Sequence, residues 1–155
     1  MATNTIPLDI SQINEYLYIS AFPLAEHEEE LQKLELQLIM SMSLWKPSQK
    51  LAAGDRQLIW LPSFDSPILP IPLFLLKRGV RMALPIIQNG EKILVHCQAG
   101  KHRSVAMASC ILISTGMTAD QATSLIKDKR PIADPDIWYI KSRILKFESE
   151  YNQRI

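Results

Sequence analysis

The sequence has almost no excess of charge of either sign. Its 155 residues include 17 Lys and Arg against 16 Asp and Glu, which gives a formal net charge of +1. A protein that coats nucleic acid needs a clear excess of basic residues, and an acidic tail protein needs the opposite. We therefore expect no nucleic-acid partner, and the charge balance leaves a globular enzyme or a binding module.

Cysteine is scarce as well. The sequence contains only Cys97 and Cys110, which are too few for a disulfide framework. A chain of this length can bury about 70% of the surface that it exposes when unfolded, so it needs neither disulfides nor a structural metal. We predict a single domain over residues 1–155, with no metal and no cofactor.

Signals for membrane insertion or secretion are also missing. The opening segment, MATNTIPLDISQ, has no basic stretch followed by an apolar core and is not a signal peptide. The most apolar stretch, residues 68–76, contains two prolines and is far shorter than the roughly 20 residues of a membrane span. The final residues, YNQRI, are not a prenylation box. These observations predict a cytoplasmic protein without a membrane span.

Short apolar runs alternate with helical patterns along the chain. The predicted strands cover residues 15–20, 38–42, 57–61 and 92–96, the first as an edge strand and the others buried. The predicted helices cover residues 25–37, 73–88, 104–115, 118–130 and 134–152. Such alternation is typical of an α/β layer fold. We expect a central, mostly parallel twisted sheet of four or five strands with helices on both faces.

Three helix signals carry specific expectations. Thr118 and Gln121 match a capping box. Asp134 is predicted to cap the last helix, with Pro135 at its first position. Pro85 is expected to kink the helix that contains it, because proline removes one backbone hydrogen bond.

The strongest pattern in the sequence is HCQAGKHRS, residues 96–104, between a buried strand and a helix. A tight loop that runs into a helix start turns its backbone N–H groups inward, and these donors form an anion cradle with the helix dipole. Gly100 allows the backbone angles that such a turn needs. The guanidinium of Arg103 can hold two phosphoryl oxygens at once. The pattern therefore indicates a phosphate site.

The same positive field acts on Cys97. A free thiol has a pKa of about 8.5, and a helix N-terminus with a nearby arginine lowers it. We expect Cys97 to be a thiolate nucleophile, and His96 to hydrogen-bond the loop and fix it rather than act as a base. The predicted backbone donors to phosphate are Gln98, Ala99, Gly100, Lys101 and His102.

The segment HCQAGKHRS resembles the phosphate-binding loop of the cysteine-dependent protein tyrosine phosphatases, His-Cys-x5-Arg-Ser/Thr. The surrounding pattern is similar to the small, atypical dual-specificity phosphatases of that superfamily. The resemblance covers nearly the whole chain, through the segments INEYLYIS, QLIMSMS, QLIWLPSFDSP and KRPIADPDIWYIKSRILKFE.

The resemblance implies a metal-independent phosphomonoester hydrolase that works in two steps. Cys97 attacks phosphorus and forms a phosphocysteine while an acid protonates the leaving oxygen, and the same acid then activates water as a base. Asp65, 32 residues before Cys97, matches that acid, and Ser104 matches the hydroxyl that stabilises the leaving sulfur. The expected substrate is a phosphorylated protein or small molecule, and a phosphate or sulfate ion is expected to fit the site.

Several of these residues also have simpler interpretations. Asp65 precedes Ser-Pro, a common turn context, and Ser104 could simply start a helix. Asp55, the rival acid, is expected in a turn before a strand. Cys110 is expected in the core rather than as a redox partner of Cys97. His27, in a glutamate-rich helix, is expected to be exposed.

Lys101 and His102 depart from the commonest dual-specificity loop, which carries small or apolar residues there. Lys101 matches a basic residue in phosphoinositide phosphatases of the same superfamily, which favours a highly anionic substrate; the alternative is that Lys101 and His102 are a solvated pair on the loop rim. Trp45 and Lys46 are expected to rim the pocket, or Trp45 to pack in the interior. Asp134 and Asp136, where many relatives carry Asn, are explained by capping.

Three classes of function remain open on these residues. The first is a protein tyrosine or dual-specificity phosphatase, and the second is a phosphoinositide or other non-protein phosphatase. The third, a non-catalytic phosphate-binding module, is disfavoured because nucleophile, arginine, hydroxyl and acid are all present. A rhodanese-type sulfurtransferase would need neither the Asp65 segment nor the Arg103-Ser104 pair. The sequence leaves open the pocket depth, the physiological substrate and the oligomeric state.

Overall fold

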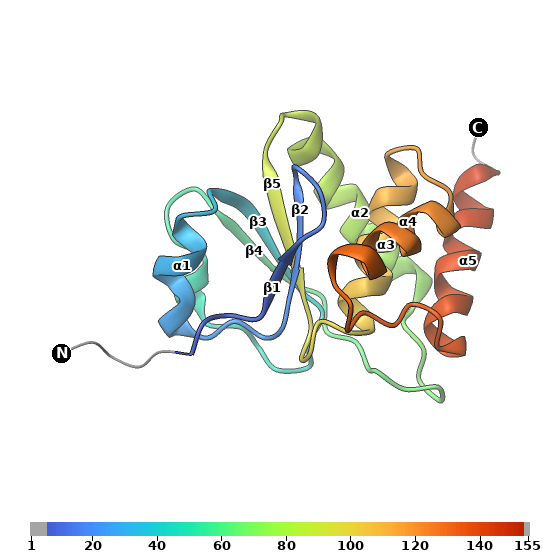
Figure 1. Cartoon of the computed structure of the whole chain (residues 1–155), viewed down its shortest axis with the longest axis horizontal. Helices are drawn as coiled ribbons and strands as arrows, with labels where there is room; N and C mark the ends of the chain where they lie inside the picture. The colour runs from blue at the N-terminus through green and yellow to red at the C-terminus, as the bar shows by residue number, and fades with distance from the viewer. Residues whose placement is uncertain (1–5, 154–155) are drawn as a thin grey trace.

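A five-stranded sheet runs through the middle of the molecule in the computed structural model, which describes residues 6–153 (Figure 1). The strands are β1 (Ile10–Gln12), β2 (Leu17–Ser20), β3 (Leu36–Ser41), β4 (Gln57–Trp60) and β5 (Lys92–His96). Their spatial order is β1-β2-β5-β3-β4, with β1 antiparallel to β2 and the other pairs parallel. The mostly parallel sheet is as predicted. The ends of the predicted domain, residues 1–5 and 154–155, lie outside the described residues.

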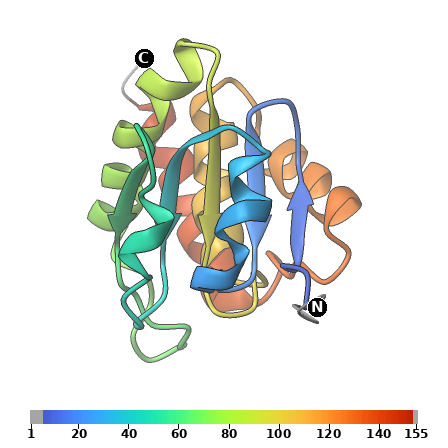
Figure 2. The same cartoon turned by 90° about the vertical axis from the view of Figure 1, so that its left-hand side faces the viewer.

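Helices cover both faces of the sheet, but unequally. Figure 1 shows α2, α3, α4 and α5 on one face and the short α1 on the other; Figure 2 looks at the sheet from the α1 side. The helices are α1 (Glu28–Gln32), α2 (Leu73–Gln88), α3 (Arg103–Ser114), α4 (Ala119–Lys129) and α5 (Trp138–Asn152), with short 3-10 turns at Ala25–His27 and Gln49–Leu51. The predicted α/β layer fold is confirmed.

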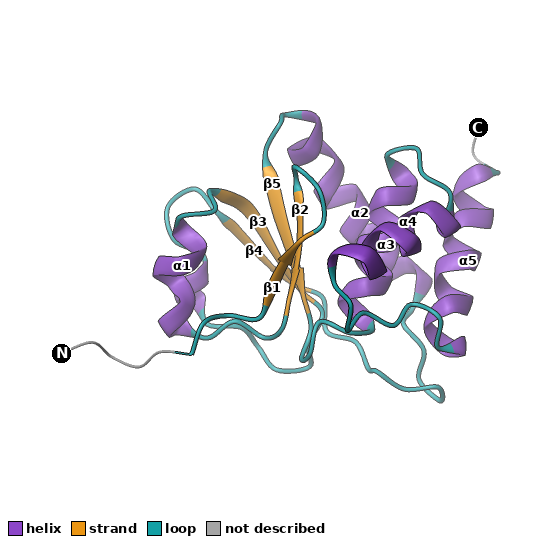
Figure 3. Ribbon diagram, in the orientation of Figure 1, coloured by secondary structure: helices purple, strands orange, loops and turns teal. Residues whose placement is uncertain are grey.

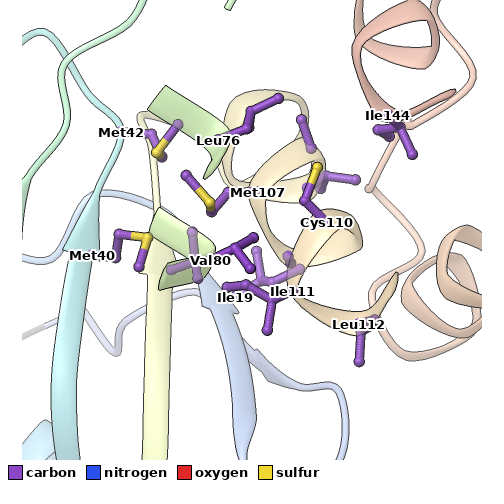
Figure 4. Close-up of a cluster of buried hydrophobic side chains, with 14 of the residues drawn as sticks. Ile19, Met40, Met42, Leu76, Val80, Met107, Cys110, Ile111, Leu112 and Ile144 are labelled. Carbon is purple, nitrogen blue, oxygen red and sulfur yellow. The ribbon is translucent and has the colours of Figure 1, made fainter. Parts of the chain in front are cut away.

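The main core lies between the sheet and α2 to α5. Helix α3 packs at its centre, and residues 103–113 are all buried. Figure 4 shows side chains from α3, such as Met107 and Ile111, meeting Ile19 and Met40 of the strands. Cys110 belongs to this cluster with no exposed surface, and burial raises the pKa of its thiol. Its predicted role as a core residue is confirmed.

Two strand predictions are wrong in their position. Residues 15–20 were expected to form an edge strand, but every residue of β2 is buried and β1 takes the edge. A three-residue strand such as β1 is too short to give a periodic signal. Residues 57–61 were expected to be buried, but β4 is the opposite edge strand and Trp60 is 41% exposed. An apolar run does not reveal whether a neighbouring strand will cover it.

The predicted helix over residues 25–37 is much shorter in the structure. A 3-10 turn and the five-residue α1 end at Gln32, and the chain turns at Glu35, with a φ of 55°, into β3. The leucine spacing is compatible with a helix, but pairing with β5 begins at Leu36 and competes with it. His27 is 7% exposed, not exposed as expected. Its Nδ1 accepts from the Leu24 N–H, and its Nε2 lies 3.0 Å from the Ile6 carbonyl oxygen.

The last helix begins later than predicted. Asp134 caps a turn instead, because its Oδ1 accepts from the Asp136 N–H at 3.2 Å, and α5 starts at Trp138. The capping box of α4 is confirmed by reciprocal hydrogen bonds between Thr118 and Gln121. Helix α2 runs through Pro85 as a single helix, and the kink there stays a prediction.

Candidate active site

The predicted site residues lie together at one end of the sheet, beyond the carboxyl ends of the parallel strands. Figure 3 shows several loops meeting beneath the carboxyl ends of the strands, the place where open α/β sheets bind ligands. Two of these loops carry the site. The Cys loop, residues 97–102, joins β5 to α3, and the Asp65 loop, residues 61–72, joins β4 to α2.

Four successive carbonyl oxygens of the Cys loop bind donors outside it. The Gln98 oxygen accepts from Phe22 N, the Ala99 and Gly100 oxygens from Arg130 Nη2 and Nε, and the Lys101 oxygen from Asp134 N, at 2.7–3.1 Å. In a trans peptide the following N–H points the opposite way from the carbonyl. The N–H groups of residues 99–102 therefore face the hollow of the loop, as an anion cradle requires.

Cys97 lies at the base of this cradle and is 2% exposed. Its Sγ is 3.2 Å from the hydroxyl oxygen of Ser104. Burial by itself raises the pKa of the Cys97 thiol, but the hydroxyl and the N–H of Ser104 outweigh it by hydrogen bonding to the sulfur. The charge of Arg103 and the N–H of Gly100 act in the same direction. The net result is a lowered pKa, which increases the share of the nucleophilic thiolate at neutral pH.

Arg103 connects the Cys loop to the Asp65 loop. Its Nη1 donates to the Ser63 carbonyl oxygen at 2.7 Å and, more weakly, to the Met42 carbonyl oxygen at 3.4 Å. The residue is 8% exposed, and its Nε has no hydrogen-bond partner among residues 6–153. An unpaired guanidinium N–H in a buried place is a donor that an anion would satisfy.

The Asp65 carboxylate is held by two donors from distant parts of the chain. The Tyr139 hydroxyl donates to Oδ1 at 2.7 Å, and His102 Nδ1 donates to Oδ2 at 2.8 Å. Partial burial raises the pKa of Asp65, but these two hydrogen bonds and the nearby charges of His102 and Arg103 lower it further, and the net pKa is below its ordinary value. Asp55, the rival acid, lies in a turn before the amino end of β4, at the end of the sheet away from the Cys loop.

His96 is fully buried behind the Cys loop. Its Nδ1 is 3.3 Å from the carbonyl oxygen of Cys97, and the ring of Phe22 meets it edge-on at 5.3 Å. Burial lowers the pKa of His96 to about 4, against the opposing effect of that hydrogen bond. A neutral imidazole at this place fits the prediction that His96 supports the loop and takes no proton from Cys97.

Sequence reasoning missed Arg130, which holds the backbone of the Cys loop by hydrogen bonds to its carbonyl oxygens. Arg130, 1% exposed, bonds two loop carbonyls and also the Asp9 carboxylate, at 3.1 Å from Nη1 and 2.9 Å from Nη2. At the end of α4 it looked like an ordinary helix-terminal cation. Tyr139 was missed as well, because 74 residues separate it from Asp65 and no local pattern joins them.

The residues expected on the rim of the site differ in how exposed their side chains are. Lys101 is exposed as expected for a solvated side chain, but the side chain of His102 is only 13% exposed and is bound to Asp65, so the two are not a solvated pair. Trp45 is 72% exposed on the loop after β3, and the packed alternative is wrong.

Within the part of the chain that the structure describes, no group of three or more His, Cys, Asp or Glu side chains is arranged to hold a metal ion. No helix among residues 6–153 is both long and apolar enough to cross a membrane.

The family follows from comparison with known proteins. The model of the dual specificity phosphatase catalytic domain matches residues 17–150. The chain belongs to this family, which confirms the predicted resemblance and the predicted enzyme class within the protein tyrosine phosphatase superfamily.

Individual relatives are distant. The chain is 27% identical over 144 residues to the tyrosine-protein phosphatase yvh1 of Schizosaccharomyces pombe. The matched region covers 92% of this chain but only 43% of the length of that protein. It is 26% identical over 150 residues to human dual specificity phosphatase 28, covering 95% of this chain and 82% of that one. A crystal structure of human DUSP28 superimposes with a TM-score of 0.83 at 23% identity, over 94% of this chain and 99% of that chain. At that identity the structural likeness shows the fold alone.

Proposed function

We propose that this chain hydrolyses phosphate monoesters of phosphorylated proteins through a phosphocysteine intermediate, with residues 1–155 acting as one catalytic domain. The observation that carries the proposal is Cys97 itself. A buried thiol with a lowered pKa lies under four inward-facing N–H groups. Arg103, whose charge helps to lower that pKa, has an Nε without a hydrogen-bond partner among residues 6–153. That arrangement suits a thiolate attacking a bound phosphoryl group.

Each proposed role has a physical basis in the site. The N–H groups of the Cys loop and Arg103 bind the phosphoryl oxygens and stabilise the charge that develops on them. Cys97 attacks phosphorus, the P–O bond to the leaving group breaks, and protonated Asp65 delivers its proton to the leaving oxygen. In the second step Asp65 takes a proton from water, which attacks phosphorus, and the sulfur leaves as a thiolate stabilised by Ser104.

The test is hydrolysis of p-nitrophenyl phosphate at mildly acidic pH in the presence of a chelator. The wild-type protein should turn over the substrate without metal, and Cys97→Ser should abolish turnover because serine is not ionised in this pH range. The Cys97→Ser protein should still bind phosphate or tungstate. Wild-type turnover no greater than that of Cys97→Ser would sink the proposal.

A second candidate is a phosphoinositide or other highly anionic non-protein substrate. It is supported by the exposed Lys101 beside the cradle. A PTPMT1 structure in complex with PI(5)P superimposes with a TM-score of 0.82 at 21% identity, a likeness of fold alone. A panel of phosphopeptides and soluble phosphoinositides would decide between the candidates. If Lys101→Ala leaves the ratio of lipid to peptide activity unchanged, the lysine argument fails.

The non-catalytic alternative is tested by the same assay. The structure of a human tyrosine phosphatase-like serine/threonine/tyrosine-interacting protein superimposes with a TM-score of 0.81 at 20% identity. The fold therefore does not separate catalysis from binding, and the argument for catalysis rests on the side chains of Cys97, Arg103 and Asp65.

A further inference from the structure

His102 occupies an unusual place between two carboxylates. Its Nδ1 donates to Asp65 at 2.8 Å, while its buried Nε2 has no hydrogen-bond partner within the described part of the chain and lies 3.8 Å from Oδ2 of Asp134. The ring also packs edge-on against the ring of Tyr139, with the two centroids 6.1 Å apart. His102 is thus surrounded by three neighbours: Asp65 from the Asp65 loop, Asp134 from the segment between α4 and α5, and Tyr139 from α5.

We propose that His102 is a positioning residue for Asp65, which fixes the carboxyl group over the Cys loop and sets the pH at which Asp65 can act as an acid. The inference rests on the proposed function of the site and deepens it. His102 belongs to the Cys loop itself, directly before Arg103, so the acid is tied to the same loop that binds the phosphoryl group. Asp65 is therefore placed relative to the phosphate and not only relative to its own loop.

Tyr139, on α5, is the second donor to Asp65, and His102 and Tyr139 together form a clamp on its carboxylate. Partial burial and then donation to Asp65 raise the pKa of Tyr139 to about 12, so its hydroxyl keeps its proton at working pH. The ionisable groups that face the His102–Asp65 pair are Tyr139 from α5, Asp134 from the segment between α4 and α5, and Arg103 from the start of α3. Arg103 and His102 favour the ionised form of Asp65.

The clamp has opposite effects on the two chemical steps. An ionised, fixed Asp65 is ready to accept a proton from water in the second step. Protonation of Asp65 for the first step requires a lower pH than an unclamped carboxyl would need, because the hydrogen bonds favour the anion. The rate of the first step should therefore fall as pH rises through the lowered pKa of Asp65.

The experiment compares kcat/KM against pH for two substrates. Phenyl phosphate has a poor leaving group and needs the acid, while p-nitrophenyl phosphate has a good leaving group and needs it much less. General acid catalysis contributes about 10²–10⁴-fold, so with phenyl phosphate His102→Ala should lower the low-pH plateau by about tenfold as part of that contribution. The alkaline limb should also move to higher pH, and the loss with p-nitrophenyl phosphate should be much smaller.

Two further variants separate positioning from folding. His102→Asn keeps an N–H donor near Asp65 but carries no charge, so it should recover the plateau with phenyl phosphate while its alkaline limb stays at the higher pH. Asp136→Asn removes a nearby carboxylate that pairs with Lys127 instead, and it should match the wild type. Equal losses with both substrates and an unmoved alkaline limb would show that His102 is merely structural.

An activity-free measurement distinguishes this inference from the proposed function. Carboxyl ¹³C NMR of the Cys97→Ser protein should give an Asp65 pKa below the ordinary value, and His102→Asn in that background should raise it. If the wild type is inactive while Asp65 still responds to His102, the proposed function fails and the clamp stands. If Asp65 titrates identically with and without His102, the inference fails whatever the activity.

Discussion

Opposing effects meet at the single sulfur atom of Cys97. Removing a thiolate from water is costly, and burial alone would keep Cys97 protonated. Hydrogen bonds from the hydroxyl and the N–H of Ser104 reverse that effect, with help from the charge of Arg103. Cys110 has the same burial without such donors, and its pKa is raised. The pKa values of the two cysteines of this chain thus shift in opposite directions because their neighbours differ.

Ser104→Ala tests this balance. Removing the hydroxyl takes away a hydrogen bond to the thiolate, so the pKa of Cys97 should rise and the pH midpoint for alkylation by iodoacetamide should move upward. Turnover should fall about tenfold, the cost of losing one hydrogen bond of about 1.5 kcal/mol to a charged group. Ser109→Ala is the matched control, since that buried hydroxyl donates to the Val105 carbonyl oxygen instead. An unchanged alkylation midpoint in Ser104→Ala would contradict this account.

At the scale of elements, the Cys loop depends on segments that hold its backbone from outside. Gly100 has a φ of 67°, and a Cβ there would lie 2.7 Å from both Arg130 Nη2 and the Ser20 carbonyl oxygen. Only glycine fits this close approach. Arg130 then fixes the orientation of two peptide groups, and the carboxylate of Asp9 holds the far side of the guanidinium. The cradle is therefore a joint product of β5, α4 and the segment before β1.

Arg130→Met should destabilise the protein and impair the site. It leaves two loop carbonyls unsatisfied at about 1–3 kcal/mol each, so we expect the free energy of unfolding in urea to fall by about 3 kcal/mol. kcat/KM should fall even where the variant is fully folded, because the peptide groups are no longer fixed. Asp9→Asn should cost about 1 kcal/mol or less, since the Asp9 side chain is 59% exposed. Lys129→Met, at an exposed neighbouring position, is the control. An equal loss of stability and of kcat/KM in that variant would contradict the proposed support of the Cys loop by Arg130.

At the scale of the whole molecule, the sheet is covered thickly on one face and thinly on the other. Helices α2 to α5 form the main core with one face, whereas α1, the turn at Gln49–Leu51 and the chain before β1 cover the other (Figures 1 and 2). Strand β5 lies at the middle of the sheet, so His96 at its end has no exposed surface. The site is thus built at the end of the central strand of the sheet.

This placement predicts that stability falls in acid. The pKa of His96 is 6.5 in the unfolded chain, and burial lowers it to about 4 in the folded protein. Between these values the unfolded state holds the extra proton, so the free energy of unfolding should decrease as pH falls from 6.5 to 4. The full change is on the order of 3 kcal/mol. Urea denaturation at pH 7, 6 and 5 should show this slope, and His96→Gln should reduce it. Equal slopes in both proteins would contradict the assignment.

The sequence by itself determined the elements whose signals are local. The apolar run of residues 92–96, the following HCQAGKHRS and the helix after it predicted the strand, the Cys loop and α3, because an anion cradle needs those residues in that order. The spacing of Asp65 from Cys97 supported the acid only through resemblance to a family. The capping box of α4 was also readable, since its partners stand three residues apart.

Only the tertiary structure decided the contacts between distant segments. Arg130 reaches the Cys loop across 30 residues, and Tyr139 reaches Asp65 across 74. The position of β2 inside the sheet and of β4 at its edge depends on which neighbours pair, not on their own residues. His102 looked like a solvated rim residue until the fold brought Asp65 beside it. Local patterns record the conformations that neighbours along the chain allow, whereas burial, pairing and acidity arise from groups that meet only when the whole chain folds.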